Sequence, residues 1–419
     1  MDGDLSKLIE MQMGPTVQDK YLHWDKLRYK KAPEGLDSEH WWCGIKLARR
    51  SLYQLLPFLD YHGNPHQFAM PSSVLKTLNE LNEILYGTPF SLLDDSYVHA
   101  QIEEAITSSQ LEGASTTHRV AKEMLLKGRK PKDISERMIT NNYQAMLFIR
   151  EMKEEELTVK MVFELHKILT ENTLDDAEMT GQFRKESDDI HVWDPVEQQV
   201  VHTPPKAAEL PKRLELLCDF ANDRLENFSI DPLVKAILLH YCLAYDHPFI
   251  DGNGRTARAL FYWSLLHAGY PLIQYISISE ILRKGPIQYG RAFLYTETDD
   301  NDTTYFIVHQ LEVISKAINA LKDHLKHKIK ETEEIDKLLE NSQANFPMNH
   351  RQKALLVHAL KHPKTHYFIE IHRKCNDVTY DTARNDLLSL AKFGFLIKQK
   401  QGKAFSFVVA PNLKSLLGS

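Results

Sequence analysis

Cysteine is scarce in this chain, with four residues among 419. No two of them have the Cys-x-x-Cys spacing of a zinc site, and so few cysteines in so long a chain argue against a disulfide framework. The first residues also lack the basic stretch and apolar run of a secretory signal. These absences predict reduced thiols in a cytoplasmic protein.

Long hydrophobic runs, internal repeats and low-complexity tracts are missing as well. One stretch, residues 259–279, has no formal charge, but His267, Gly269 and Pro271 interrupt it. Its continuous apolar part is about half the length of a membrane span. It therefore predicts a buried helix followed by a turn, and we expect no membrane partner.

Positive charge is not in excess, because the net charge is −6, so the chain as a whole is not a polycation that coats nucleic acid. The charge is unevenly spread, however. Residues 346–419 carry 12 Lys and Arg against 4 Asp and Glu, so the preceding part is strongly acidic. A basic C-terminal part on an acidic body suggests different partners for the two parts.

The length predicts two to four domains at roughly 100–200 residues each. Apolar residues recur at three- and four-residue intervals in many segments, which predicts a mainly α fold. The expected helices are 118–126, 134–151 with Asp133 as N-cap, 158–172, 205–227, 232–245, 256–268 and 305–342. The expected domains are a helical N-terminal region (1–95), a central domain (96–310), a helical linker (311–345) and a C-terminal domain (346–419).

The C-terminal domain has three helical patterns, at 351–360, 367–375 and 379–393, followed by an alternating stretch around a Gln-Gly turn at 401–402. Three helices and a β-hairpin predict a winged helix. Such a domain could bind DNA through the helix at 379–393, with phosphate contacts from Lys398, Lys400 and Lys403. Docking to a protein is the alternative.

The most reactive-looking stretch, AYDHPFIDGNGRTARALFYW from Ala244 to Trp263, lies between two apolar segments. Pro248 disfavours helix at the residue before it, so the first helix should end near Asp246 and present His247 at the mouth of a loop. Thr256 should open the next helix. The flanking helices would form a rigid scaffold for the polar loop.

The loop has the features of a polyphosphate site. Gly252 and Gly254 allow successive amide N–H groups to converge on an anion, and a helix N-terminus follows them. Two guanidinium groups, three residues apart, suit phosphate oxygens. Asp251 would be repelled by phosphates unless a cation such as Mg²⁺ lay between them. The intrinsic pKa of His247 suits proton transfer near neutral pH. A simple helix–loop–helix bend is the plainer alternative.

The segment HPFIDGNGRTAR, residues 247–258, resembles without departure the signature of the Fic family, His-Pro-Phe-x-(Asp/Glu)-Gly-Asn-Gly-Arg-x-x-Arg. The resemblance covers roughly residues 100–300, and the terminal regions are similar, less specifically, to those of many larger bacterial members. It implies a mostly helical fold that transfers AMP from ATP, with Mg²⁺, to a hydroxyl group of a target protein.

The resemblance also implies a role for each residue of the motif. His247 would be the general base, Asp251 would hold Mg²⁺, and Arg258 would reach the γ-phosphate. The ATP-binding residues would be Gly252, Asn253, Gly254, Arg255, Arg258 and, near the adenine, Tyr289. His240, two helical turns before His247, is most simply a hydrogen-bonded core histidine.

The resemblance implies a function for two further segments. The turn GQFR at 181–184 and the alternating stretch 188–205 predict a hairpin flap. The flap would align a target segment by strand-like pairing through Ile190, His191, Val192 and Trp193. The segment TSSQLEGAS, which alone reads as a helix end, resembles the family's inhibitory helix through Ser108, Glu112 and Gly113. Glu112 would pair with Arg258 and deny the γ-phosphate its partner.

Two alternatives remain open at this stage. The same site could remove AMP from a modified protein, with Glu112 positioning a water molecule. A protein of another class, a DNA-binding regulator whose central domain senses a nucleotide, would fit the basic C-terminal domain. A homo-oligomer is also open, and the sequence names neither the target protein nor the modified residue.

Overall fold

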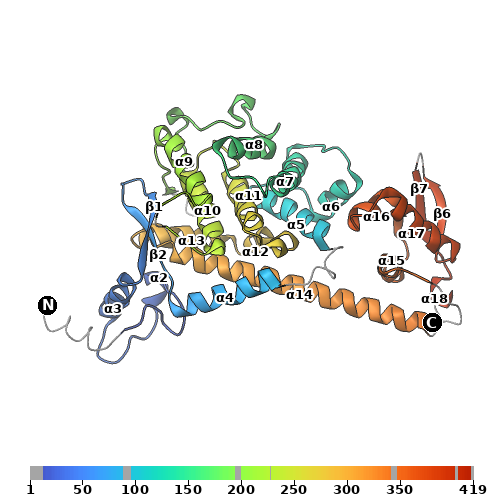
Figure 1. Ribbon diagram of the computed structural model, residues 1–419, viewed down its shortest axis with the longest axis horizontal. Helices are drawn as coiled ribbons and strands as arrows, with labels where there is room; N and C mark the ends of the chain where they lie inside the picture. Colours follow the sequence, from blue (N-terminus) through green and yellow to red (C-terminus); the bar gives the residue numbers. More distant parts are fainter. Residues whose placement is uncertain are drawn as a thin grey trace.

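The computed structural model describes residues 13–87, 96–193, 200–226, 228–340, 347–401 and 404–416 (Figure 1). Helices predominate and the sheets are small and antiparallel, so the expected mainly α fold class is confirmed. The N-terminal region and the C-terminal domain lie at opposite ends of a helical body. None of the described helices is both long and apolar enough to cross a membrane.

The N-terminal region combines short helices with a strand hairpin that the sequence pattern did not predict. Its elements are α2 (Trp24–Leu27), α3 (Ser38–Arg50), β1 (Tyr53–Leu59), β2 (Pro65–Ala69) and α4 (Ser72–Gly87). The period-two signal of β1 is short, because only Leu56 and Phe58 point into the core and the pairing shifts register between Leu55 and Leu59. An all-helical reading of this region is therefore wrong.

The body consists of helices that mostly follow the predicted ranges, but the helix expected at 205–227 is shorter, because Ala207–Glu209 form a 3₁₀ turn and the α-helix spans only Leu210–Ala221. They are α5 (Ser96–Leu111), α6 (His118–Lys127), α7 (Ile134–Glu151), α8 (Val159–Thr170), α9 (Leu210–Ala221), α10 (Pro232–Asp246), α11 (Asn253–His267), α12 (Ile278–Lys284) and α13 (Pro286–Thr298). The predicted N-cap of α7 is confirmed, since the Glu136 amide donates to Asp133 Oδ1 at 2.8 Å. The two strands β3 (Val192–Trp193) and β4 (Val200–His202) form the expected hairpin between α8 and α9.

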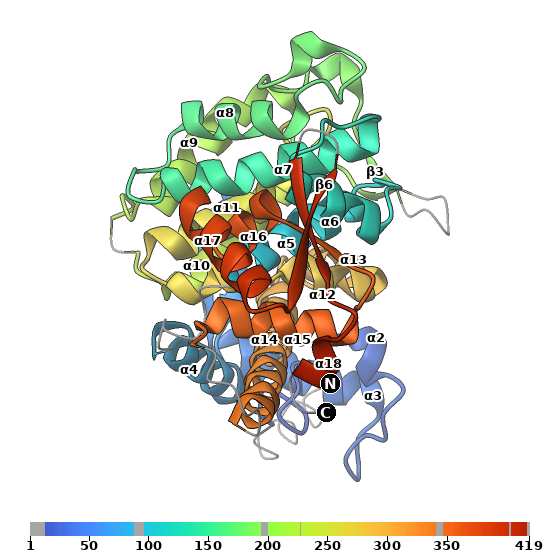
Figure 2. The ribbon, with the colours of Figure 1, turned by 90° about the vertical axis from the view of Figure 1, so that its right-hand side faces the viewer.

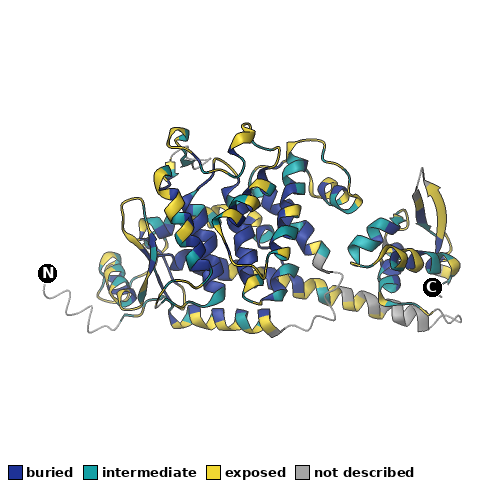
Figure 3. Ribbon diagram, turned by 45° about the horizontal axis from the view of Figure 1, so that its top comes forward, coloured by how far each residue is buried: buried dark blue, intermediate teal, exposed yellow. Residues whose placement is uncertain are grey.

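Helices α10 and α11 form the centre of the main hydrophobic core (Figure 3). Almost every residue of α10 is buried, including Leu233, Ile237 and Leu243. In α11 the uncharged stretch is buried through Leu265, and the helix ends at His267 before a turn at Gly269. A loop between two such helices is held on both sides by packed elements, because a close-packed core permits little displacement.

A single long helix, α14 (Thr304–Glu340), extends from beneath the body toward the C-terminal domain (Figure 1). Its first residues are packed into the core, with Phe306 and Ile307 fully buried. The proposed boundary at residue 310 thus falls inside a continuous helix. The other two proposed boundaries, at 95–96 and 345–346, fall on residues that are not all described.

The C-terminal domain contains α15 (His350–Lys361), β5 (His366–Phe368), α16 (Ile369–Cys375), α17 (Tyr380–Lys392), β6 (Leu396–Gln401), β7 (Ala404–Val409) and α18 (Leu413–Leu416). The strands form one antiparallel sheet in the order β5-β7-β6, and β6 and β7 form a projecting hairpin (Figure 2). The helix expected at 367–375 begins only at Ile369, because His366–Phe368 pair with β7 as strand β5. Helices α15–α17 and the β6–β7 hairpin are the elements on which the winged-helix assignment rests, and that assignment stays a prediction. Lys403 lies outside the described residues.

The C-terminal domain contacts the body through α16, which packs against α5 and α6. Lys127, the last residue of α6, lies over the Phe368 ring at 5.9 Å from the ring centroid. The domain is therefore packed against the same helix, α5, that leads to Glu112.

Candidate active site

The motif loop joins α10 to α11, and two left-handed residues shape it. His247 caps α10 with φ 46° and ψ 56°, and Gly252 precedes α11 with φ 80°. A Cβ atom at Gly252 would also lie 2.9 Å from the Thr170 methyl group, so glycine is required there twice over.

Helix α11 begins at Asn253, three residues before the predicted Thr256. The Asn253 side chain closes the loop, because its Oδ1 accepts from the Phe249 amide at 2.9 Å and its Nδ2 donates to the Phe249 carbonyl at 2.8 Å. The Gly252 carbonyl accepts both the amide and the hydroxyl of Thr256. Asn253, Gly254 and Arg255 therefore form the first helical turn and not a flexible loop.

His247 is half-buried at the end of α10, and burial lowers its pKa to about 4. Its Nδ1 lies 3.3 Å from the Ala244 carbonyl, which can only accept, so Nδ1 carries the proton. No partner of Nε2 is found among the described residues. Arg184 donates from Nε to the His247 carbonyl at 2.8 Å and fixes the backbone. The imidazole is neutral at pH 7 with Nε2 unprotonated, as a general base requires.

Asp251 and Arg255 form an ion pair at 3.1 Å on the rim of the loop. The Arg255 guanidinium is fully buried and donates from Nη1 to the Leu169 carbonyl at 3.0 Å. The Asp251 carboxylate keeps half of its side-chain surface exposed and accepts from the Gly252 amide. Arg255 thus orients Asp251 from inside the protein, and its own guanidinium group is not exposed at the surface of the loop.

Arg258, the last residue of the motif, is buried under the end of α5. Its Nε donates to Ser108 Oγ at 2.9 Å, and its Nη2 donates to the Ser108 carbonyl at 3.0 Å and to Glu112 Oε1 at 2.8 Å. Gly113 follows with φ 92° and ends the helix. The structure thus brings Arg258 into contact with Ser108 and Glu112, which lie 150 and 146 positions before it in the sequence.

Gly254 lies directly against the Glu112 carboxylate. A Cβ atom at this position would lie 2.3 Å from Glu112 Oε1, a distance at which one of the two groups must move. Glycine is required here for close approach and not for an unusual φ angle.

Tyr289 on α13 reaches the same region from the other side. Its hydroxyl lies 2.8 Å from His240 Nε2, and its titration is influenced by both Arg258 and Glu112. Burial raises the pKa of Tyr289 to about 12 and keeps His240 neutral. His240 is therefore a buried histidine, as expected, but it also supports a predicted site residue.

The part of the chain that contains the motif loop is similar in sequence to proteins of a known family. Residues 156–265 match the model of the Fic/DOC family. The protein adenylyltransferase Fic of Drosophila willistoni is 35% identical over 116 residues, which cover 28% of this chain and 21% of that protein. Its counterpart in Nematostella vectensis is 34% identical over 119 residues, 28% of this chain and 25% of that protein. The matched segment, residues 156–265, is therefore similar to a Fic domain.

The chain covers only 21% and 25% of the length of these two curated relatives. A crystal structure of a Fic family protein from Desulfovibrio desulfuricans G20 resembles the chain much further, over 82% of this chain and 98% of that one. Its TM-score is 0.50 at 18% sequence identity, which supports a shared fold.

One supporting residue of the Fic motif was missed in the sequence. His166 on α8 accepts from the Gly181 amide at Nδ1, at 3.0 Å, and donates from Nε2 to the Asp251 carbonyl at 2.9 Å. Its ring stacks on Phe249 at a centroid distance of 3.8 Å. His166 thus joins the predicted 181–184 turn to the Fic loop. In the sequence, His166 lies on the apolar face of the predicted helix, where it resembles an ordinary core residue.

The predicted flap is anchored next to His247. In β3 and β4, Val192 pairs with His202 and Trp193 with Val200. His202 donates from Nε2 to the Tyr245 carbonyl at 2.7 Å, two residues before His247. Ile190 and His191 lead into β3, with His191 Nδ1 lying 3.3 Å from Thr203 Oγ1. Residues 194–199, at the tip, lie outside the described residues.

Proposed function

We propose that this Fic protein transfers AMP from ATP to a hydroxyl side chain of a target protein, and that Glu112 restrains this activity. The observation that carries the proposal is the occupation of Arg258 by Glu112, beside a neutral His247 with an unprotonated Nε2. The family relationship supports the reaction class, because the curated relatives are named protein adenylyltransferases.

In the proposed reaction the target hydroxyl oxygen attacks the α-phosphorus of ATP. Its proton passes to His247 Nε2, the bond from the α-phosphorus to the bridging oxygen breaks, and pyrophosphate leaves. Proton transfer by such a base contributes roughly 10²–10⁴-fold to the rate. The N-terminal amides of α11, at Asn253 and Gly254, would bind phosphate oxygens, because a helix N-terminus favours negative charge. The Gly252 amide is bonded to Asp251, so Gly252 would contribute through its backbone shape and close approach.

Asp251 fits a role as a single Mg²⁺ ligand. Half of its side-chain surface is exposed, and Arg255 and the Gly252 amide hold its orientation. The described residues contain no cluster of three His, Cys, Asp or Glu that could hold a metal alone, which suits an ion bound partly through phosphate oxygens. Mg²⁺ would supply neutralisation of phosphate charge.

The flap would present the target. Strands β3 and β4 pair only with each other among the described residues, so one edge is available for an extended segment. Because His202 anchors the flap at Tyr245, a segment paired there would lie close to His247. Tyr289, the proposed adenine contact, is partly exposed to solvent. Its hydroxyl group is hydrogen-bonded to His240, which would hold the ring in place for stacking on the adenine.

The free energy of the Arg258–Glu112 hydrogen bond sets how strongly Glu112 would restrain AMP transfer. A charge-assisted hydrogen bond such as Arg258–Glu112 is worth about 1.5–3 kcal/mol, and only a quarter of the Glu112 side chain is exposed. ATP must displace Glu112 before its γ-phosphate can reach Arg258. At about 1.4 kcal/mol per tenfold, release would raise the competent population roughly ten- to a hundredfold.

Transfer of α-phosphate label from ATP into proteins of a cell lysate, and into the chain itself, tests the proposal. Glu112→Gly should raise labelling roughly ten- to a hundredfold over wild type. Glu151→Gly, at the exposed end of α7, is the matched control and should leave labelling unchanged. Arg258→Ala, alone or with Glu112→Gly, should be inactive because it removes the phosphate ligand. Labelling that falls in Glu112→Gly would instead favour removal of AMP, with Glu112 positioning water.

A further inference from the structure

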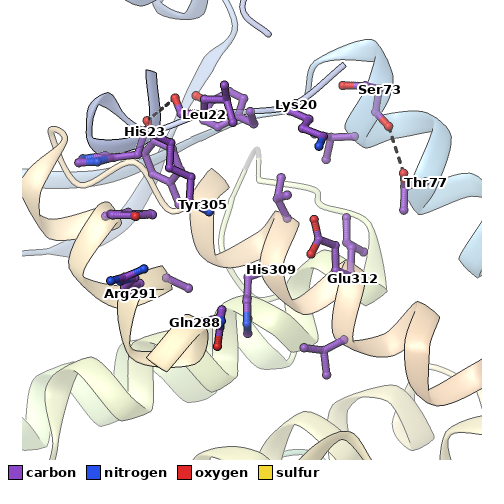
Figure 4. A pocket seen from close by; sticks show the side chains of 18 of the residues that line it. Lys20, Leu22, His23, Ser73, Thr77, Gln288, Arg291, Tyr305, His309 and Glu312 are labelled. Carbon is purple, nitrogen blue, oxygen red and sulfur yellow. Dashed lines mark hydrogen bonds between the residues drawn. The ribbon is translucent and has the colours of Figure 1, made fainter. Parts of the chain in front are cut away.

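A separate cavity of about 470 Å³ lies between the N-terminal region and helices α13 and α14 (Figure 4). This volume is within the range of small-molecule sites. Figure 4 shows Gln288, His309 and Glu312 on the side of the cavity opposite Lys20. Nothing in the Fic motif contributes to its walls.

The walls carry an excess of positive charge. Its cationic side chains are Lys20, Lys26, Arg291 and Lys316, against the carboxylates Asp19 and Glu312. In the part of the chain that the structure describes, none of these four cations is in an ion pair. The two histidines of the wall add no charge at pH 7, because burial lowers the pKa of His309 to about 4 and that of His23 below its usual value.

The four cations are exposed to solvent around one concave surface, and their charge is opposite in sign to that of the chain. The chain as a whole has a net charge of −6. Cations that are left without carboxylate partners in a concave surface focus a positive potential and raise the local concentration of anions. The positive charge on Lys26 and Lys316 is strong enough at His309 to contribute to its low pKa, so both cations act on the same space.

We propose that this cavity binds a small anion that carries a phosphate group with two or more negative charges. Lysine and arginine side chains are the usual phosphate ligands in proteins. Gln288, His309 and the hydroxyl groups of Ser73 and Thr77 supply neutral hydrogen-bonding groups to the same space. The charge excess matches a phosphate ester or inorganic pyrophosphate equally.

The cavity is separated from the Fic site by one pair of rings. His309 lines the cavity, and its ring faces that of Tyr289 at a centroid distance of 6.2 Å. Tyr289 in turn is close to Arg258 and Glu112. A ligand held against His309 would therefore contact the wall that supports the proposed adenine position, although its binding does not depend on any transfer reaction.

Calorimetric titration of the full chain with inorganic pyrophosphate, and separately with AMP, tests the proposal. The variant Arg291→Ala/Lys316→Ala should raise the Kd at least roughly tenfold, because charge-assisted contacts are lost. The matched control Lys160→Ala/Lys212→Ala, which removes the same charge from exposed positions on α8 and α9, should leave the Kd unchanged. Glu312→Gln should lower the Kd by up to about fivefold, because it removes a like charge.

The tighter binding expected of Glu312→Gln cannot arise from a failure to fold. AMP binding without pyrophosphate binding would identify a phosphate ester, and the reverse would identify an inorganic polyphosphate; each outcome supports the proposal. Binding that the cavity substitutions leave unaltered would place the anion at the Fic loop and overturn the proposal. So would the failure of both probes to bind at millimolar concentration.

Discussion

Burial changes the pKa of His247, the residue that the motif predicts as the general base. An exposed histidine has a pKa near 6.5, whereas burial at the end of α10 lowers the pKa of His247 to about 4. A base must be neutral to accept a proton, so kcat/KM for AMP transfer should stay level from pH 8 down to about 5. It should fall only as the pH approaches about 4, provided circular dichroism shows the chain still folded. A half-maximal rate near pH 6.5 would contradict the low pKa.

Gly254 offers a second test at the residue scale. In the wild-type background, Gly254→Ala should lower the free energy of unfolding by about 1–3 kcal/mol, because the new methyl group would overlap Glu112. In a Glu112→Gly background the same change should cost much less, because the 2.3 Å overlap is gone and only Arg258 Nη1, the movable end of a side chain, remains 3.0 Å from the added Cβ atom. Urea unfolding of the four proteins measures both values. Equal effects in both backgrounds would refute the close approach of Gly254 to Glu112.

Among the elements, α8 holds the Fic loop through His166. Replacement by Phe keeps the ring stacked on Phe249 but leaves the Gly181 amide and the Asp251 carbonyl without their partner. His166→Phe should therefore cost about 2–3 kcal/mol of unfolding free energy and slow AMP transfer. His62→Phe, on an exposed loop, is the control. Unchanged stability would show that the loop does not depend on α8.

His166 should also make stability depend on pH. Burial lowers its pKa to about 4 in the folded chain, while the unfolded value is about 6.5. The unfolded state therefore binds more protons between these values, and the free energy of unfolding falls as the pH drops from about 6.5 to about 4. The slope in this window should be shallower in His166→Phe than in wild type.

The whole molecule joins an acidic body to a basic C-terminal domain. If the hairpin β6–β7 contacts DNA, the affinity of the full chain should fall steeply with salt, because fewer counterions are then released. Lys398→Ala/Lys400→Ala should reduce the slope of log Kd against log salt by roughly two. Lys160→Ala/Lys212→Ala is the control. The absence of binding at about 50 mM salt would favour a protein-docking role.

The arrangement of the C-terminal domain gives this test a second readout. Helix α16 packs against α5 and α6, and α5 leads into the Glu112 segment. A partner that pulls α16 away would remove support from the restraint on Arg258. AMP transfer measured with and without DNA therefore tests whether binding at the C-terminal domain changes the activity of the site around Arg258.

Much of this protein is determined by local sequence. The helices of the body follow from apolar spacing, and the N-cap at Asp133 follows from residue type, because both depend on neighbours three or four positions away. The Fic motif is contiguous, so its residues could be named from the sequence. The start of α11 could not, since it depends on the Asn253 side chain closing back onto Phe249.

Contacts between distant segments were decided only by the tertiary structure. Arg255 is part of the motif and was expected to contact phosphate, yet its guanidinium is buried and bonded to Asp251 and the Leu169 carbonyl. His166 looks like core until the 181–184 turn and the Fic loop meet on its two nitrogens. The basic cavity combines residues 19–77 with residues 288–316, and Gln67 of β2 forms a bridge with Asp302. Spacing along a chain reports which face of one element a residue occupies, whereas packing decides what lies opposite that face.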